Sequence, residues 1–432
     1  MKKAILLYSF MLFVFSSWGQ WSSSAMPTEK VQLAAIGYGN SVWFGGGATN
    51  TFVSNKIEIY NRSTGEWTQL NLSVARIFAG ATAGGGKVFF AGGVNFANFQ
   101  HYSRVDIIDT ATLTSSTHEL SAAKFAVAAV SHNNKVYFAG GVNVDLGVND
   151  AQIDILDLNT NTWSVDMMTY PGGVRAVVSG DDVVFVGDHW MDIFHTNNNT
   201  RTSLSLPENR GLTAVVALNN EIIIAGGEDQ NDITSDRVDI YNLSTGQWSL
   251  ANLSEPRSFL NSFTTVCGKA YFAGGGTFHV AGGQWTTASS RVDIYDANAG
   301  TWATDELSNA VVNHAVASSD NQLFSAGGYN FTSVLSNVDI FTCQTNGLLD
   351  FQQSQFAPLP IIGNPVRDVL KLDGAIVSNS QNAVQILNVA GQIVLERHIT
   401  ENEIDVQFLP SGLYIIKVLN RHGTYLGKFF KE

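Results

Sequence analysis

Basic residues recur along this 432-residue chain at a nearly fixed distance before pairs of glycines. In the regular repeats the basic residue lies sixteen positions before the first glycine, as Arg76 does before Gly92. The residues at this spacing are Lys30, Arg76, Lys124 and Arg210, with Arg257 seventeen positions before Gly274. We add Arg175, which is the basic residue of the shorter fourth repeat. The formal net charge is −13, so positive side chains gathered at one opening would focus the field and favour an anionic ligand. In the alternative interpretation, each cation only hydrogen-bonds neighbouring loops.

Aromatic and polar side chains gather in the segments that follow the glycine pairs. The residues that we expect to face a ligand there are His101, Tyr102, Trp190, Trp285 and Tyr329. Exposed rings are informative when they cluster, and rings beside Asn and Asp side chains suit the faces and hydroxyls of sugars. The longest of these segments, residues 276–290, is predicted to cover part of the site. In the alternative interpretation, the rings pack against their own loops.

Support for catalysis is weak in this sequence. The nine histidines are scattered, and no His-x-x-x-His, Cys-x-x-Cys or Gly-x-Ser-x-Gly motif is present. The acidic segment 228–232 lacks the spacing of a calcium loop. We therefore predict no catalytic residue, metal or cofactor. The exception is the segment Asp188-His189-Trp190 with His195 close behind, where a general acid or base could be built. In the alternative interpretation, this segment is one degenerate repeat.

The segments that must position these residues repeat along the chain. Seven apolar runs end in glycine, and their first glycines lie 46, 48, 47, 39, 48 and 53 residues apart. Small residues and a polar turn precede each run, an alternating segment with one acid follows it, and most repeats then show a tryptophan. The acids are Glu58, Asp106, Asp154, Asp192, Asp239, Asp293 and Asp339. Because these acids belong to a strand pattern, we predict that they brace the repeats.

A period near fifty residues that combines a glycine pair, an acidic-apolar strand and a tryptophan resembles the kelch repeat, whose units are blades of a β-propeller. The resemblance implies an all-β fold with seven four-stranded blades, one for each apolar run. Trp21 has no repeat in front of it, yet it lies 25 residues before Gly46, just as Trp67 lies 25 before Gly92. We therefore predict that an N-terminal strand around Trp21 completes the last blade and closes the ring.

The chain is predicted to contain a signal peptide, the propeller, a linker and a small second domain. Residues 1–19 combine two lysines, a short apolar run and small residues before the cut, as secretory signals do. The propeller takes residues 20–345, and a linker with Gln, Ser and Pro takes residues 346–359. The apolar run of the signal is too short to span a membrane, and no later stretch is long and apolar enough to do so.

The last segment, residues 360–432, has the alternating pattern of a small β-sandwich. It resembles the type IX secretion sorting domain in Asn364 and Pro365, in Gly391, and in Gly412 and Tyr414. This resemblance implies the type IX secretion machinery as a partner. It also implies passage through the periplasm and across the outer membrane of a Bacteroidetes-type bacterium, to the cell surface or the medium.

The two cysteines, Cys267 and Cys343, are predicted to remain unbridged even though the chain is secreted. Cys267 is expected to end the innermost strand of blade six, and Cys343 to follow the third strand of blade seven. Strands two apart in a sheet are separated by about 9 to 10 Å. A disulfide allows only roughly 7 Å between the Cα atoms.

These features together predict a secreted or surface-displayed binding module for a glycan or protein ligand, with no nucleic-acid partner. The ligand is expected where the loops after the second and fourth strands emerge, because propellers bind ligands on loop-built faces around the channel. Kelch-like propellers also include galactose oxidases and sialic acid mutarotases, so a carbohydrate-active enzyme is the alternative. The oxidase would need a Cys–Tyr cross-link with His ligands, and we find no match to that motif.

Overall fold

The computed structural model divides the chain into two compact units, Met1–Cys343 and Gln344–Glu432. The described residues are 19–143, 148–231, 233–258, 263–279, 284–343, 357–359, 361–362, 364–372, 382–388, 393–399, 402–420 and 423–432. The predicted signal peptide lies outside them except for Gly19, and the predicted linker lies outside them except for residues 357–359. No described helix is long and apolar enough to cross a membrane.

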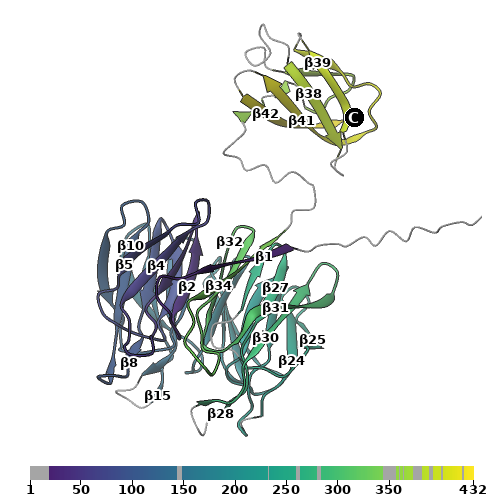
Figure 1. Ribbon diagram of the computed structural model, residues 1–432. Helices are drawn as coiled ribbons and strands as arrows, with labels where there is room; N and C mark the ends of the chain where they lie inside the picture. Colours follow the sequence, from purple (N-terminus) through teal and green to yellow (C-terminus); the bar gives the residue numbers. More distant parts are fainter. Residues whose placement is uncertain are drawn as a thin grey trace, which may run out of the picture. The chain divides into compact units, whose positions relative to one another are not determined.

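The first unit is built from four-stranded antiparallel sheets, which are the blades of a propeller (Figure 1). In blades one to six the chain runs from the innermost strand to the outermost. Blade one is β2 (Ala34–Tyr38), β3 (Ser41–Gly45), β4 (Lys56–Asn61) and β5 (Trp67–Asn71). Blade two is β6 (Gly80–Gly84), β7 (Lys87–Ala91), β10 (Arg104–Asp109) and β11 (Ser115–Glu119). Blade three is β12 (Ala128–His132), β13 (Lys135–Ala139), β16 (Gln152–Asp157) and β17 (Thr162–Met167).

The remaining blades follow the same order. Blade four is β18 (Arg175–Ser179), β19 (Asp182–Val186), β20 (Trp190–His195) and β21 (Thr200–Ser205). Blade five is β22 (Ala214–Leu218), β23 (Glu221–Ala225), β24 (Arg237–Asn242) and β25 (Gln247–Asn252). Blade six is β26 (Phe263–Val266), β27 (Lys269–Ala273), β30 (Ser289–Asp296) and β31 (Thr301–Val311). Blade seven is β32 (Ala315–Ser319), β33 (Gln322–Ala326), β34 (Asn337–Cys343) and β1 (Gly19–Ala25).

Contacts between innermost strands show that the ring is closed. Each innermost strand touches that of the next blade, and the last pair, β32 and β2, returns to the start. Small residues allow this approach, since a Cβ atom added to Gly80 would lie 2.4 Å from the carbonyl oxygen of Val127. The second strands are instead buried on both faces between blades, as Val88 to Phe90 illustrate. The predicted all-β propeller with seven blades is confirmed for the described residues.

The N-terminal strand β1 completes blade seven, as predicted. It pairs antiparallel with β34, with Trp21 opposite Phe341, and the centroids of the two rings are 5.1 Å apart. The indole N–H of Trp21 donates a hydrogen bond to the carboxylate of Asp305 in blade six at 2.7 Å. The first residues of the propeller are therefore joined to its last two blades.

A disulfide joins Cys267 to Cys343, so the prediction that these cysteines remain unbridged was wrong. Cys267 lies in the turn between β26 and β27 of blade six, and Cys343 ends β34 of blade seven. The prediction applied the spacing of strands within one sheet. The two residues instead belong to neighbouring blades, whose packing brings their Cα atoms to 6.5 Å. Cys343 also pairs with Gly19 at the start of β1.

The second unit is a β-sandwich in its described residues. The larger sheet has the order β35-β42-β41-β38-β39 and the smaller has the order β36-β37-β40. Leu370, Ile404 and Ile416 belong to the one core that the two sheets share. The strands are β35 (Ala357–Pro358), β36 (Ile361–Ile362), β37 (Val369–Leu372), β38 (Asn382–Asn388), β39 (Ile393–Ile399), β40 (Glu403–Asp405), β41 (Gly412–Asn420) and β42 (Gly423–Lys431).

Most of the predicted sorting motif gathers at one end of this sandwich. The side-chain oxygen of Asn364 accepts the amide of Phe430 in β42 at 2.8 Å, and a cis peptide bond joins Asn364 to Pro365. Gly412 begins β41, and the hydroxyl of Tyr414 donates to the carbonyl of Pro410 at 2.9 Å. Because β41 pairs with β42, these positions are neighbours. Gly391 lies outside the described residues.

Deletion of Gln20–Ser24 is expected to lower the melting temperature, because it removes most of β1 and exposes the edge of β34. Trp21→Ala alone should cost about 2 kcal/mol of the free energy of unfolding, since it empties a partly buried site. Thermal unfolding followed by circular dichroism measures both effects. Ser23→Ala, on an exposed side chain of the same strand, is the control. An unchanged melting temperature in the deletion variant would contradict the closing role of β1.

The double variant Cys267→Ser/Cys343→Ser is expected to lose about 2–4 kcal/mol of stability, because the bridge restricts the unfolded chain. The two cysteines are 76 residues apart, so a long loop is released. Denaturant titration of both proteins gives the difference. Reductant should destabilise the native protein to a similar extent and leave the double variant unchanged. Two free thiols in the unfolded, unreduced protein would argue against the bridge.

Candidate functional site

Two sets of loops form one face of the propeller, at the start of the innermost strands. Loops that follow fourth strands meet loops that follow second strands through backbone bridges, such as Ile77 with Val94. Some second-strand loops extend into hairpins, and Figure 1 shows β8, β15 and β28 at the same end of the propeller. These hairpins are β8 (Val94–Asn95) with β9 (Gln100–His101), β14 (Val142–Asn143) with β15 (Val148–Asn149), and β28 (Phe278–His279) with β29 (Gln284–Trp285).

Backbone hydrogen bonds link successive blades around the channel mouth on this face. Gln32, Phe78, Ala126 and Asn313 occupy the same place in their loops and share φ values of 54 to 56°. The amide of Gln32 donates to the carbonyl of Asn313 at 2.8 Å, and the amide of Phe78 donates to Gln32 at 3.2 Å. The amide of Ala126 donates to Phe78 at 2.9 Å. Left-handed backbone is uncommon for residues other than glycine. Because it recurs at the same place in four loops, we infer that the inter-blade hydrogen bonds hold these loops in one conformation at the mouth.

Five of the six predicted cations are buried rather than exposed at the mouth. Lys30, Arg76, Lys124, Arg210 and Arg257 are at most 2% exposed. Each pairs with an acid in the third strand of the following blade. The pairs are Lys30–Glu58 (3.5 Å), Arg76–Asp106 (2.6 Å), Lys124–Asp154 (3.1 Å), Arg210–Asp239 and Arg257–Asp293. These contacts correct the expectation of an exposed basic ring and support the structural alternative.

Arg76 illustrates how one cation holds two blades. Its guanidinium donates to the carbonyl of Phe90 at 2.9 Å and to Asp106, both in blade two. Its own carbonyl accepts the amide of Gly47 in blade one at 2.9 Å. A Cβ atom on the adjacent Gly46 would lie 2.4 Å from that carbonyl, which explains the need for a glycine pair. Burial lowers the pKa of Arg76, and the charge of Asp106 opposes this effect.

Five of the seven strand-three acids also accept backbone amides, while Glu58 and Asp239 pair with Lys30 and Arg210, so the predicted bracing role is confirmed. Asp106 accepts the amide of Ser73 at 2.8 Å, at the end of the preceding blade. The same contact recurs in Asp154 with Ser121, Asp192 with Thr169, Asp293 with Ser254 and Asp339 with Ser308. Each of these acids therefore ties its blade to the blade before it.

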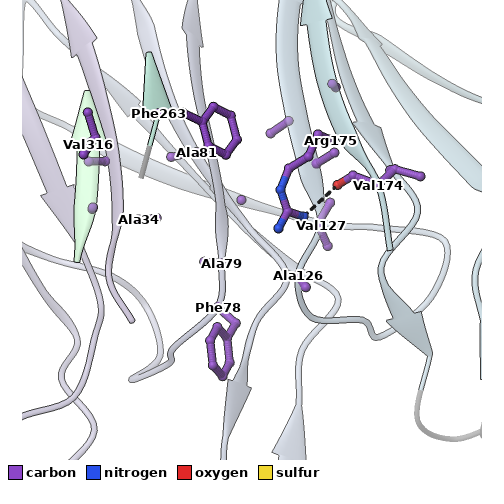
Figure 2. A pocket seen from close by; sticks show the side chains of 16 residues that line it. Ala34, Phe78, Ala79, Ala81, Ala126, Val127, Val174, Arg175, Phe263 and Val316 are labelled. Carbon is purple, nitrogen blue, oxygen red and sulfur yellow. Dashed lines mark hydrogen bonds between the residues drawn. The ribbon is translucent and has the colours of Figure 1, made fainter. Parts of the chain in front are cut away.

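Arg175 differs from the other five cations because it faces the channel. It begins β18 and lines a cavity of about 200 Å³ between the innermost strands (Figure 2). Most lining residues are alanine, glycine or valine, together with Phe78 and Phe263. Among the described residues that line the cavity, Arg175 is the only charged one. Its guanidinium donates to the carbonyl of Val174 at 3.3 Å. Burial lowers the pKa of Arg175, and the charge of Asp188 raises it.

Four rings beside the channel mouth form what we call the mouth cluster: Phe78, Phe96, Phe125 and His101. The centroid of Phe96 lies 6.4 Å from those of both Phe78 and Phe125. His101 lies 5.9 Å from Phe125. Phe96 is 47% exposed, and the other three are half-buried. Because Phe78 also lines the cavity, the mouth cluster and the cavity form one continuous surface.

The hairpin β28–β29 reaches the mouth from blade six, as predicted for residues 276–290. The indole N–H of Trp285 donates to the side-chain oxygen of Asn313 at 2.9 Å. The buried carboxylate of Glu228 in blade five accepts the amide of Phe278 at 3.0 Å and fixes the base of the hairpin. Trp285 is therefore positioned beside a residue of the mouth, and it remains half-buried.

The remaining predicted loop rings have different surroundings. Tyr329 packs against Phe331 in blade seven, with 5.5 Å between their centroids. Tyr102 follows β9, and its amide donates to the carbonyl of Gly93 at 3.0 Å. Trp190 is only 1% exposed and belongs to the core between blades three and four, which corrects the expectation that it faces a ligand.

The histidines considered for catalysis do not share one site. His189 precedes β20, where its ring lies 6.0 Å from that of Tyr170, and His195 ends β20. A strand of this length separates the two by about 20 Å. His195 bonds Asp182 at 2.7 Å and Thr202 at 3.1 Å, at the end of blade four opposite the mouth. Within the described ranges, no group of three or more His, Cys, Asp or Glu side chains could hold a metal ion.

Phe78, Phe125 and Asn313 were not among the predicted site residues, although the repeat contained a signal for them. Phe78 lies two positions after the repeated cation Arg76, and Phe125 lies one position after Lys124. The residue two positions after the cation has left-handed backbone at the mouth in several blades. Alignment of the repeats on the cation would therefore have indicated positions that point to the channel, whereas the cation itself points away from it.

Comparisons with known proteins agree with this architecture. Residues 361–432 match the family described as the secretion system C-terminal sorting domain. Residues 209–252 and 310–346 match the Kelch motif, and each range covers most of one blade. The chain thus carries Kelch motifs and a type IX sorting domain, which directs it across the outer membrane to the cell surface or outside and implies contact with the secretion machinery.

One curated relative is spermatocyte protein spe-26 of Caenorhabditis elegans. It is 26% identical to this chain over 166 residues, which cover 36% of the chain and 28% of the relative. The chain thus matches less than a third of the length of that protein.

Arg76→Ala is expected to cost about 3–5 kcal/mol of the free energy of unfolding, because it leaves Asp106 buried without its cation. Arg291→Ala is the matched control. Arg291 pairs with Glu306 at 2.9 Å on the surface, where such pairs contribute about 0–1 kcal/mol. Denaturant titration of both variants gives the comparison. Similar small losses in the two variants would show that the buried pair does not hold the blades.

Proposed function

We propose that this protein is a secreted or surface-displayed carbohydrate-binding module whose ligand binds at the channel mouth. The observation that carries the proposal is the mouth cluster, where exposed and half-buried rings from separate loops lie beside the opening of a cavity. The sorting domain delivers the propeller to the outside of the cell, where glycans are available as ligands. A protein partner on the same face is the second candidate and an outcome of the test below.

The rings of the mouth cluster suit the faces of sugars. One face of a pyranose ring presents C–H groups, which pack against aromatic rings, while its hydroxyls remain at the edge. Removing about 50 Å² of ring surface from water contributes about 1 kcal/mol at ~25 cal/mol/Å². Several rings acting together with polar groups would therefore support binding in the range of millimolar to micromolar dissociation constants.

Polar groups beside the rings supply partners for hydroxyls. Gln32 and Asn313 lie in the loops of the mouth, and His101 belongs to the mouth cluster itself. Trp285 approaches from the hairpin β28–β29 on another side of the opening. This combination of apolar faces and hydrogen-bonding side chains favours a polyhydroxylated ligand over a purely apolar one.

The carbohydrate-active enzyme alternative remains a prediction. The described residues at the mouth include His101, whose ring packs against Phe125. Turnover of a sugar substrate by the purified protein would favour this alternative over a binding module.

The test is a glycan array probed with the purified protein and with Phe96→Ala. We expect the protein to bind at least one class of glycan, and we expect Phe96→Ala to weaken that binding about fivefold to tenfold. Leu250→Ala is the matched control, because Leu250 is 60% exposed on β25, an outer strand away from the mouth. A blank array, or equal losses in both variants, would overturn the proposal and direct the search to a protein partner.

A further inference from the structure

We propose that the channel cavity binds an acidic sugar and that Arg175 is the counter-ion of its carboxylate. The inference rests on the proposed function and specifies that the sugar in the channel carries a negative charge. It follows from the position of Arg175, from the blade that lacks the usual cation, and from the size and lining of the cavity.

Arg175 occupies a place that alanine or glycine holds in the five other blades where the structure describes this position. It is the first residue of the innermost strand β18. Arg175 pairs with the residue before Gly187, and the residues in the same register in the other described blades are Ala34, Gly80, Ala128, Ala214 and Ala315. A long charged side chain at this place extends into the channel, and Figure 2 shows it among the lining residues, with its bond to Val174.

Arg175 is not needed to brace its own blade. The position sixteen residues before Gly187 is Pro171, so blade four lacks the repeated cation. The acid of this blade, Asp192, accepts the amide of Thr169 at 2.6 Å and the hydroxyl of Ser203 at 2.5 Å. Thr169 and Ser203 thus provide Asp192 with hydrogen bonds. Asp192 therefore does not require Arg175 as a partner in the way that Asp106 requires Arg76.

The guanidinium suits a carboxylate ligand. Arginine remains protonated at neutral pH and can bind both oxygens of a carboxylate through parallel N–H groups. Burial weakens competition from water, so a charged ligand gains more there than it would on the open surface. The negative charge of Asp188 attracts the guanidinium of Arg175 and raises its pKa, so it competes with an anionic ligand. Burial raises the pKa of Asp188 itself. Removal of the Asp188 charge should therefore strengthen the attraction of Arg175 for an anion.

The cavity has the size and lining for one sugar residue. Its volume of about 200 Å³ equals the space of about seven waters at ~30 Å³ each. The innermost strands are sheet edges, so backbone N–H and C=O groups of the channel wall face the cavity and can bond hydroxyls. Phe78 connects the cavity to the mouth cluster, so an acidic residue in the channel would place the next sugar beside the exposed rings.

The test compares two disaccharides of the same linkage, one that ends in a uronic acid and one that ends in the neutral sugar. Isothermal titration calorimetry measures both with the full protein, with Arg175→Gln and with Asp188→Asn. We expect the protein to prefer the acidic disaccharide at least tenfold. Arg175→Gln should abolish this preference by weakening the binding of the acidic disaccharide at least tenfold, and Asp188→Asn should increase the preference. Unchanged circular dichroism spectra and melting temperatures verify that the variants fold.

The outcomes separate this inference from the proposed function. Equal binding of the two disaccharides, or an acidic preference that survives in Arg175→Gln, overturns the inference and leaves the carbohydrate-binding function in place. Failure of both disaccharides, together with a blank glycan array, overturns the two proposals together. Binding of a peptide with a free C-terminal carboxylate in place of the acidic disaccharide also overturns the inference, because the carboxylate would then come from a protein partner.

Discussion

The buried contact between a loop cation and a strand-three carboxylate is the interaction on which the rest of the propeller depends. In Arg76 the side chain reaches Asp106 of one blade while the backbone carbonyl binds Gly47 of the blade before it. A charge pair away from water tolerates little displacement, because a separated partner would remain buried and unsolvated. The loop that carries the cation is therefore fixed at both ends, and the left-handed residue two positions later, such as Phe78, is placed at the channel mouth.

Much of the fold was predictable because each repeat of the sequence forms one four-stranded blade. The spacing of Trp21 to Gly46 was enough to identify the closing strand, since the same strand-to-strand path gives the same count elsewhere. The period could not say whether Lys124 points outward or inward, because a loop has no fixed alternation of side chains. It also could not place Cys267 against Cys343, because the distance between blades depends on their packing and not on position along the chain.

Blade four departs from the repeat at two places, one in the core between blades and one in the candidate site. Trp190 fills space beside Gly187 and becomes core, while Arg175 takes a channel position that small residues hold in the five other blades where this position is described. The sequence singled out His189 and His195 of this blade as a candidate acid or base, with degeneration of one repeat as the alternative, and the two histidines lie at opposite ends of β20. A repeat protein tolerates a change in one unit, because the other blades still close the ring.

The disulfide also determines how the propeller would respond to a pulling force. Cys343 is the last residue of the first unit, and everything beyond it leads toward the sorting domain by which the chain is exported. Tension along that tail enters the propeller at Cys343, at the end of the strand that pairs with β1. Without the bridge, such a load would peel β34 away from its neighbours one hydrogen bond at a time. With the bridge, the load passes through a covalent bond to Cys267 and is carried by blade six. The pairing of β1 with β34, which closes the ring, then bears less of the load.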